Sequence, residues 1–210
     1  MKILDAAFVT SVPADGWLPA DCGPTVALVG RSNVGKSSLI NALTGRRIAR
    51  AGQKPGTTRL ANLYALHTSE PGRKPQRVTL ADLPGYGYAR GGGNARRQFD
   101  ELTRTFFSQL ARPDTADRPV GTAWLAGALL VVDARHPGLG SDRDALAWLE
   151  DIGSPITVVA TKIDRLSRSA LAAARRAHPT ALGVEVLPVS SRTGEGVRPV
   201  LAGLAAMLDA

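Results

Sequence analysis

The sequence predicts an α/β fold in which helices cover both faces of a mostly parallel sheet of six strands. Three observations favour this class. Short apolar runs alternate along the chain with segments in which apolar residues recur at helical spacing. The composition, 44% apolar and 21% charged, is ordinary for a globular domain. Polar motifs also follow several predicted strands directly, at the sheet edge where folds of this class bind their ligands.

The strands are predicted from compact aliphatic runs. TVALVG ends in a glycine, and the next two strands flank the turn-rich sequence SEPGRKPQ. GALLVVDA is far shorter than the ~20 residues that a membrane-spanning helix needs, so it indicates a buried strand. The predicted strands cover residues 25–30, 60–67, 77–82, 127–134, 155–162 and 184–190.

The helices are predicted from apolar residues at helical spacing and from polar or glycine residues at their ends. In the first helix Leu39, Ile40 and Leu43 share one face, and Gly45 ends the pattern. A later helix is expected to open at Ser141. The predicted helices cover residues 36–45, 95–111, 141–152, 167–178 and 196–208.

Length and residue usage limit the class of protein. We expect residues 1–24 to form an N-terminal extension with one short strand or turn, and residues 25–210 to form a single domain. The one cysteine, Cys22, excludes an intramolecular disulfide and a cysteine-based zinc cluster. The start carries Asp5 and no long apolar core, so it does not resemble a signal peptide. These features favour a cytoplasmic protein without a membrane partner.

The positive charge is concentrated in one segment. The net charge is +8, and residues 46–104 hold twelve Lys/Arg and four Asp/Glu, which leaves fourteen of each sign for the rest of the chain. A clustered excess of this kind is typical of a surface that binds a polyanion. The alternative is an ordinary solvated basic face.

The sequence GRSNVGKS matches the phosphate-loop pattern G-x-x-x-x-G-K-[ST] between a predicted strand and a predicted helix. Its glycines let the backbone N–H groups and the helix N-terminus face an anion. Lys36 is expected to reach the β and γ phosphates, and Ser37 to bind Mg²⁺. The expected phosphate-binding residues here are Gly30, Arg31, Ser32, Asn33, Val34, Gly35, Lys36, Ser37 and Ser38.

The sequence DLPG follows the predicted strand 77–82. Asp82 is expected to hold Mg²⁺, usually through water, and Gly85 to offer its backbone N–H to a γ-phosphate. The alternative is a capped turn. The residue after the glycine is Tyr86, which has no amide to orient an attacking water. The expected contributors to the phosphate site are Asp82, Leu83, Pro84 and Gly85.

The sequence TKID follows another predicted strand and indicates a guanine site. The Asp164 carboxylate can accept from guanine N1–H and its exocyclic amine, a donor pair that adenine lacks. Lys162 is expected to pack along the base, and Thr161 to tie this loop to the phosphate loop. The alternative is a turn with ordinary surface charges. The next strand adds backbone N–H donors, so the expected guanine-binding residues are Thr161, Lys162, Asp164, Ser190, Ser191 and Arg192.

The basic loop 46–59 contains a Thr pair, which is a candidate for the hydroxyl that senses a γ-phosphate through Mg²⁺. Its expected phosphate-side residues are Pro55, Gly56, Thr57 and Thr58.

The sequences GRSNVGKS, PGTTR, DLPG, TKID and SS together resemble the GTPases that include Era, EngA and TrmE. DLPGYGYA and VVDARHP are similar to the EngB family, also called YihA or YsxC, over roughly residues 22–208. The resemblance implies a three-layer P-loop GTPase domain that hydrolyses GTP slowly and switches during assembly of the large ribosomal subunit. It implies a requirement for normal cell division and growth, and places Thr58 rather than Thr57 beside Ser37 and Asp82 as a Mg²⁺ ligand.

Two departures from the resemblance lie in the loops 46–59 and 83–95, which are expected to respond to the bound nucleotide. Arg59 stands where EngB-like sequences tend to have Gln, and GGGN (91–94) replaces a more charged stretch. In related GTPases an asparagine at this position of the phosphate loop binds K⁺, which takes the place of an arginine finger. Because Tyr86 cannot orient water as a glutamine does, our hypothesis is that Asn33 binds K⁺ here and so supplies an extra cation beside the phosphates. The alternative is that Asn33 merely caps its loop. Arg59 is a second candidate for the catalytic cation. The expected catalytic residues are Lys36, Asn33, Thr58 and Gly85.

Two functions of different class remain open. In the first, a monomeric GTPase contacts rRNA of the large ribosomal subunit, or of its precursor, through residues 46–104. In the second, the chain is an interaction module that binds GTP or GDP and hardly hydrolyses GTP. An ATPase is disfavoured by Asp164.

Overall fold

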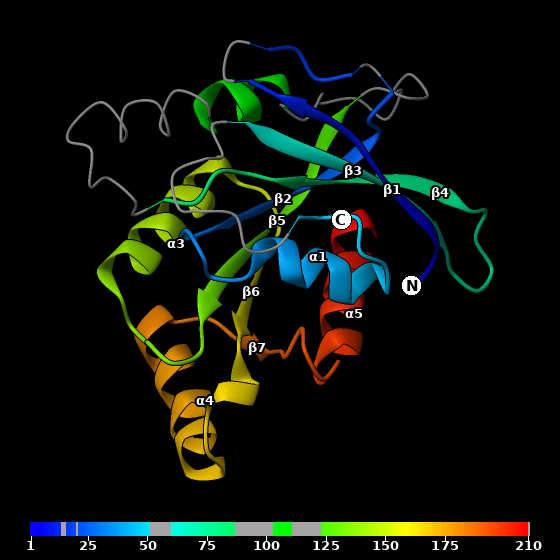
Figure 1. Ribbon diagram of the computed structural model, residues 1–210. Coiled ribbons are helices and arrows are strands. Elements are labelled where there is room, and N and C mark those ends of the chain that lie inside the picture. The colour runs from blue at the N-terminus through cyan, green and yellow to red at the C-terminus, as the bar shows by residue number, and fades with distance from the viewer. Residues whose placement is uncertain (14–15, 20, 51–59, 87–102, 111–122, 210) are drawn as a thin grey trace.

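The computed structural model describes residues 1–210 except 14–15, 20, 51–59, 87–102, 111–122 and 210. Its centre is a seven-stranded sheet in the order β1-β3-β4-β2-β5-β6-β7 (Figure 1). The strands are β1 (Lys2–Val12), β2 (Pro24–Gly30), β3 (Ala61–Ser69), β4 (Gln76–Asp82), β5 (Trp124–Asp133), β6 (Ile156–Thr161) and β7 (Val186–Pro188).

The sheet is mostly parallel, as predicted. The strands β4, β2, β5, β6 and β7 run in the same direction, so their carboxyl ends meet at one edge. Only β3 runs against its neighbours, pairing antiparallel with β4 on one side and with β1 on the other. The edge formed by the parallel strands is where the predicted motifs gather.

Strand β1 adds a seventh strand to the six that the sequence predicts. Residues 1–24 were expected to be an extension with one short strand or turn, yet Lys2–Val12 pairs with β3 along the whole length of that strand. The sequence pattern is obscured for two physical reasons. The strand lies at the sheet edge with most side chains exposed, and two irregularities in the pairing interrupt the period-two alternation of its faces.

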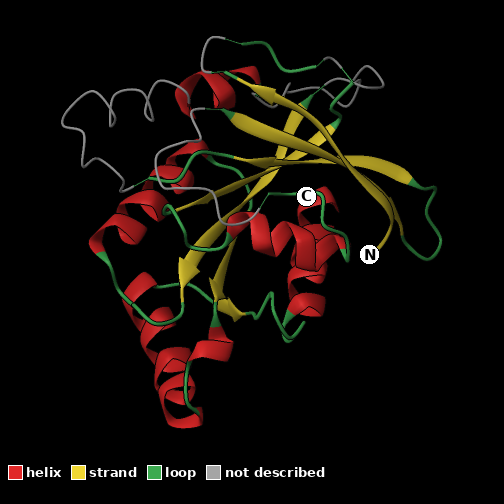
Figure 2. Cartoon of the chain, viewed as in Figure 1, coloured by secondary structure: helices red, strands yellow, loops and turns green. Residues whose placement is uncertain are grey.

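Helices cover both faces of the sheet, as predicted (Figure 2). On one face α1 (Lys36–Thr44) and α5 (Val197–Asp209) share a core that includes Leu39 and Leu204. On the other face α3 (Gly140–Ile152) packs into a second core through Leu146 and Leu149. The same side carries α4 (Arg168–Leu182) and the helical residues 103–109, the described part of the helix predicted at 95–111.

The ends of α1, α3 and α5 lie within one residue of the prediction, whereas the C-terminal end of α4 lies four residues beyond it. Helix α3 begins at Gly140 with Leu139 as its N-cap and without a side-chain cap, so Ser141 does not open it. Helix α4 was expected to end at residue 178, just before a proline, a residue that usually breaks a helix interior. It instead continues through Pro179 to Leu182, and the N–H of Gly183 donates to the Pro179 carbonyl at 2.8 Å.

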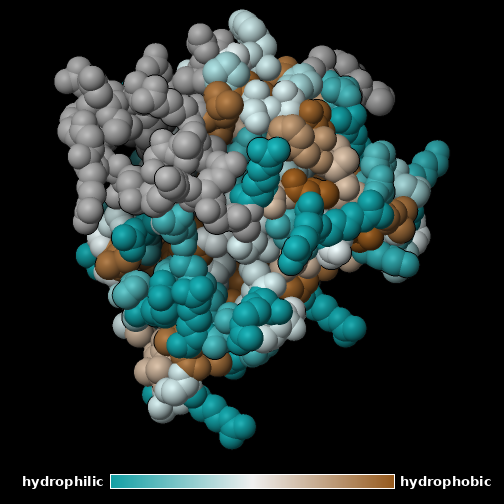
Figure 3. Space-filling view, viewed as in Figure 1, coloured by the Kyte–Doolittle hydropathy of each residue, from teal (hydrophilic) through white to brown (hydrophobic). Residues whose placement is uncertain are grey.

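The surface in Figure 3 is mainly hydrophilic over α4 and the β3–β4 turn, with smaller apolar patches elsewhere. Within the described part of the chain, no helix combines the length and apolar character needed to cross a membrane.

Candidate nucleotide-binding site

The phosphate loop, residues 30–37, connects the end of β2 to the start of α1. Asn33 (φ 60°) and Gly35 (φ 114°) have left-handed backbones, which curl the loop. Gly30 is required by close packing, because an added Cβ would lie 2.4 Å from the Val131 carbonyl oxygen on β5. The loop therefore forms a concave backbone surface at the N-terminus of a helix, which suits an anion.

Lys36 lies inside this curl. Its Nζ donates to the Gly30 carbonyl at 3.1 Å and lies 3.5 Å from the carbonyl oxygen of Arg31. The side chain is buried, and burial lowers the pKa of Lys36 while the nearby Asp82 carboxylate opposes that shift. The structure thus places a cation where the phosphate oxygens are expected.

Ser37 and Asp82 bring two oxygen ligands together. The Ser37 hydroxyl donates to Asp82 Oδ2 at 2.7 Å, across 45 residues of sequence. Burial raises the pKa of Asp82, while Lys36 and the Ser37 hydrogen bond favour its ionised form. Among the described residues no group of three His, Cys, Asp or Glu is placed to hold a metal. The pair fits Mg²⁺, which takes few protein oxygens together with water and phosphate.

The backbone of Gly85 and Tyr86 lies directly against the phosphate loop. The Ser32 N–H donates to the Tyr86 carbonyl at 3.2 Å, and the Ser32 hydroxyl donates to the Gly85 carbonyl at 3.2 Å. Arg31 and Tyr86 also form a short parallel bridge. A Cβ on Gly85 would lie 2.4 Å from the Ser32 nitrogen, so only glycine fits here without displacement.

The side chain of Tyr86 extends to helix α3, a feature that the sequence did not reveal. Its hydroxyl donates to Asp142 Oδ1 at 2.9 Å. Asp142 is only 2% exposed. The two residues are 56 positions apart, and a single sequence holds no periodic or motif signal that would pair them.

The loop after β6 is joined to the phosphate loop at two points. The Thr161 hydroxyl is 2.6 Å from the Val34 carbonyl oxygen, which is the connection expected from the sequence. Lys162 has a left-handed backbone (φ 65°), and its Nζ donates to the Asn33 carbonyl at 2.5 Å. The base-side and phosphate-side halves of the site therefore form one connected structure.

Asp164 presents an ionised carboxylate. Arg192 Nε and the Ser190 hydroxyl each donate to one of its oxygens at 2.7 Å, and these two bonds lower the pKa of Asp164. The N–H of Ser190 donates to the Glu195 carbonyl at 2.9 Å. Of the two neighbouring N–H groups expected to face a guanine oxygen, the one on Ser190 is thus already paired, whereas Ser191 keeps that predicted role.

Asp133, at the end of β5, is a second residue that the site analysis from sequence missed. Its carboxylate accepts from Lys162 Nζ at 2.9 Å and from Arg135 at 2.8 and 2.7 Å. Burial opposes ionisation of Asp133, but the hydrogen bonds from Arg135 and Lys162 outweigh it and lower its pKa. An acidic residue at the carboxyl end of a central strand was the available signal, because such ends face the ligand edge.

Four predicted phosphate-side residues, Pro55, Gly56, Thr57 and Thr58, lie outside the described part of the chain, as does Arg59.

Comparisons with known proteins agree with this geometry. Residues 25–162 match the family model described as 50S ribosome-binding GTPase. The probable GTP-binding protein EngB of Chlorobaculum parvum is 38% identical over 84% of this chain and 82% of its own length. The probable GTP-binding protein EngB of Solibacter usitatus is 37% identical over the full length of both chains.

Solved structures show the same fold. A crystal structure of a probable GTP-binding protein EngB aligns with a TM-score of 0.60 and 19% identity, over 88% of this chain and 98% of the other. The GDP- and AlF4⁻-bound Era of Aquifex aeolicus aligns with a TM-score of 0.63 and 20% identity, over 88% of this chain and 56% of Era. The phosphate loop, the predicted guanine-binding loop after β6 and these matches agree. The chain belongs to the EngB family of GTP-binding proteins, within the P-loop GTPases.

Proposed function

We propose that the chain hydrolyses GTP to GDP and phosphate with Mg²⁺ at this site, and that its nucleotide state controls binding to the large ribosomal subunit or its precursor. One observation carries the enzymatic half. The Ser37–Asp82 contact and the Thr161–Val34 contact draw three loops, far apart in sequence, to one edge of the sheet. That edge is where parallel α/β folds bind ligands.

The proposal assigns a role to each residue. Lys36 and the loop N–H groups bind the β and γ phosphates. Ser37 and Asp82 would hold Mg²⁺, which would supply positive charge next to the phosphates, and Thr58, outside the described residues, would complete its coordination when a γ-phosphate is present. Asp164 accepts from guanine.

Guanine selection by Asp164 is tested by Asp164→Asn, which turns one acceptor oxygen into an amide donor. We expect GTP affinity to fall at least about a hundredfold, because a buried donor pair on the base loses its acceptor. Equilibrium binding of GTP, ATP and XTP measures this, with the exposed Asp151→Asn as the control. Equal GTP affinity in wild type and Asp164→Asn would contradict the assignment.

We retain K⁺ at Asn33 as part of the proposal. Asn33 is exposed in the phosphate loop, and its left-handed backbone is fixed by the Lys162 contact to its carbonyl. Turnover in KCl is expected to exceed turnover in NaCl, and Asn33→Ala is expected to remove the difference. Equal turnover rates in the two salts would contradict the K⁺ role and leave Arg59 as the candidate cation.

The proposed partner surface is the basic segment 46–104. Several of its arginines are neutralised by acids elsewhere in the chain: Arg46 by Asp5, and Arg73 by Asp209. Arg47 and Arg50 are exposed, and no ion pair of theirs is found in the described part of the chain. These two are among the candidates for contacts to rRNA phosphates. The description of the matching family, 50S ribosome-binding GTPase, also supports this partner.

Co-sedimentation with purified small and large ribosomal subunits tests the partner. We expect pelleting with the large subunit, stronger with a non-hydrolysable GTP analogue than with GDP, and weakened steeply by salt. Arg47→Glu with Arg50→Glu should reduce it, whereas the exposed Arg176→Glu on α4 should not. No pelleting in either nucleotide state would contradict the ribosomal half of the proposal.

Single-turnover hydrolysis with large subunits added separates the GTPase switch from an interaction module. Faster hydrolysis with subunits supports a switch whose intrinsic turnover is slow. In this proposal the switch is a monomeric cytoplasmic protein. Unstimulated, negligible hydrolysis would favour the module.

A further inference from the structure

We infer that Tyr86 and Asp142 form a positioning pair, which anchors the segment after β4 to helix α3 and so holds Gly85 over the phosphate loop. The inference rests on the phosphate site proposed above. It assigns a role to the tyrosine that stands where a glutamine would orient water.

The acceptor of this pair is rigid. Asp142 is buried in the first turn of α3, and its own N–H donates to the Leu139 carbonyl at 3.0 Å. Burial and the neighbouring carboxylate raise the pKa of Tyr86, so the hydroxyl keeps its proton and remains a donor to Asp142 Oδ1 at 2.9 Å. A hydrogen bond from a hydroxyl to a buried carboxylate is among the stronger kinds in proteins.

Tyr86 is attached at both its ends. Its backbone carbonyl accepts from the Ser32 N–H at 3.2 Å, and its backbone bridges to Arg31. Its ring packs against the core on the α3 side of the sheet. The residue therefore spans from the phosphate loop to α3, and fixing its side chain fixes the preceding Gly85.

The charges around Asp142 favour the same arrangement. Burial and the Asp133 carboxylate raise the pKa of Asp142, while the Tyr86 hydrogen bond, Arg31 of the phosphate loop and His178 of α4 oppose that shift. The Tyr86 hydroxyl is the group that bonds Asp142 directly.

In this geometry the Tyr86 side chain does not orient the attacking water. A side chain bonded to α3 is not directed at the phosphates, so Tyr86 acts through the backbone of Gly85. Because the Gly85 N–H would meet only a γ-phosphate, losing the anchor should weaken interactions that GTP makes and GDP does not.

Tyr86→Phe is the main test, since it deletes one oxygen and keeps the packed ring. We expect the affinity ratio of a non-hydrolysable GTP analogue to GDP to fall about tenfold. Single-turnover hydrolysis should fall by a similar factor, with GDP affinity within about twofold of wild type. Asp142→Ala should match it, whereas Asp142→Asn keeps an acceptor oxygen and should largely restore both quantities.

The double variant Tyr86→Phe with Asp142→Ala should be no worse than either single variant, because the two residues act as a pair. Asp144→Asn, an exposed acid on the same helix, is the matched control and should behave as wild type. Unfolding midpoints of all variants identify losses that come from destabilisation.

An unchanged nucleotide ratio and unchanged hydrolysis in Tyr86→Phe would overturn the pair while leaving the GTPase site standing. Additive losses in the double variant, or an equal loss of GDP affinity, would also overturn it. A wild-type chain that bound no guanine nucleotide would instead overturn the proposed site, and the inference with it.

Discussion

At the scale of single residues, Gly85 has no room for a side chain. A Cβ there would lie 2.4 Å from the backbone nitrogen of Ser32 and 2.5 Å from its Cα, and neither atom belongs to a flexible side chain. Gly85→Ala should therefore displace the segment from the phosphate loop and reduce single-turnover GTP hydrolysis at least about tenfold. GDP affinity should change little.

The control for this prediction is Gly140→Ala at the start of α3, where only the end of the Arg143 side chain lies within 4 Å. It should hydrolyse GTP like wild type. Hydrolysis by Gly85→Ala at the wild-type rate would show that the observed contact with Ser32 has no part in the reaction.

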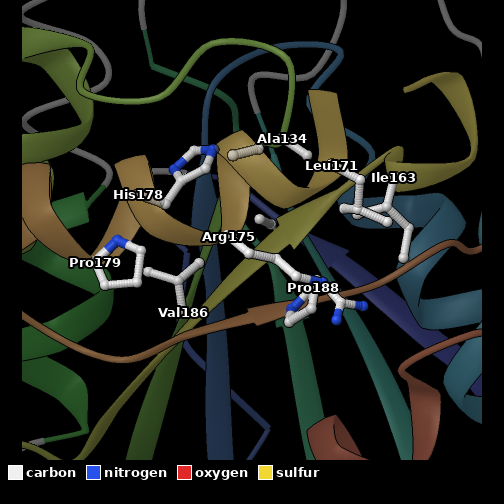
Figure 4. Close-up of a pocket in the computed structure, with 10 residues that line it drawn as sticks. Ala134, Ile163, Leu171, Arg175, His178, Pro179, Val186 and Pro188 are labelled. Atoms are coloured by element: carbon white, nitrogen blue, oxygen red, sulfur yellow. The ribbon is translucent and has the colours of Figure 1, made fainter. Parts of the chain in front are cut away.

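His178 is a second residue with a measurable consequence. It projects from α4 beside a small, largely apolar cavity whose lining includes Val186 and Pro188 (Figure 4). The ring is 3% exposed. Burial lowers the pKa of His178, although the backbone of Ala134 and the carboxylates of Asp142 and Asp133 favour the charged form.

The sign of the pH effect follows from that shift. A histidine whose pKa is lowered by folding takes up protons more readily when unfolded, so stability falls as pH drops below its ordinary value of about 6.5. Urea unfolding at about pH 7.5 and pH 5.5 should show a smaller acid loss for His178→Leu than for wild type. The exposed His67→Gln should keep the wild-type loss; parallel losses in wild type and His178→Leu would contradict the prediction.

At the scale of elements, the loop after β5 supports the loop after β6. Arg135 holds the Asp133 carboxylate, which in turn holds Lys162. Removing the guanidinium in Arg135→Ala should loosen Lys162 and speed GDP dissociation by several-fold, which stopped-flow release of a fluorescent GDP measures.

Arg135→Lys keeps the charge but not the two-point geometry, so its dissociation rate should lie between those of wild type and Arg135→Ala. Arg143→Ala is the control, because within the described residues the exposed Arg143 guanidinium donates to the Gly138 carbonyl and to no group of the site. If Arg135→Ala released GDP at the wild-type rate, Asp133 would be shown to orient Lys162 without support from Arg135.

At the scale of the whole molecule, β1 closes one side of the sheet. It covers β3, buries Ala6 and Val12, and places the N-terminal amine 3.6 Å from Glu70. A variant lacking residues 1–12 should expose the unpaired edge of β3, lower the urea midpoint and increase aggregation. Sedimentation velocity and urea unfolding measure both. A variant as soluble and stable as the full chain would show that this segment is only an extension.

The sequence predicted the parallel strands, their helices and the loops of the site, because local apolar periodicity and glycine-rich turns encode them. It predicted one short strand or turn within residues 1–24 rather than the 11-residue strand β1, whose mostly exposed edge position leaves no alternating pattern. Asp133 and Asp142 were missed because their importance comes from partners such as Lys162 and Tyr86, far away in the chain. Long-range pairing of polar side chains has no local signature.

The contacts of Thr161 and Lys162 with the backbone of Val34 and Asn33 are made between the protein's own groups. The conformational entropy of bringing the base loop to the phosphate loop is therefore lost during folding rather than during binding. A preformed site of this kind favours rapid, tight capture of GDP as well as GTP. Discrimination between GTP and GDP must then come from groups on the γ-phosphate side of the site, where the inference above places Gly85. The cycle therefore depends on a few residues rather than on the whole domain.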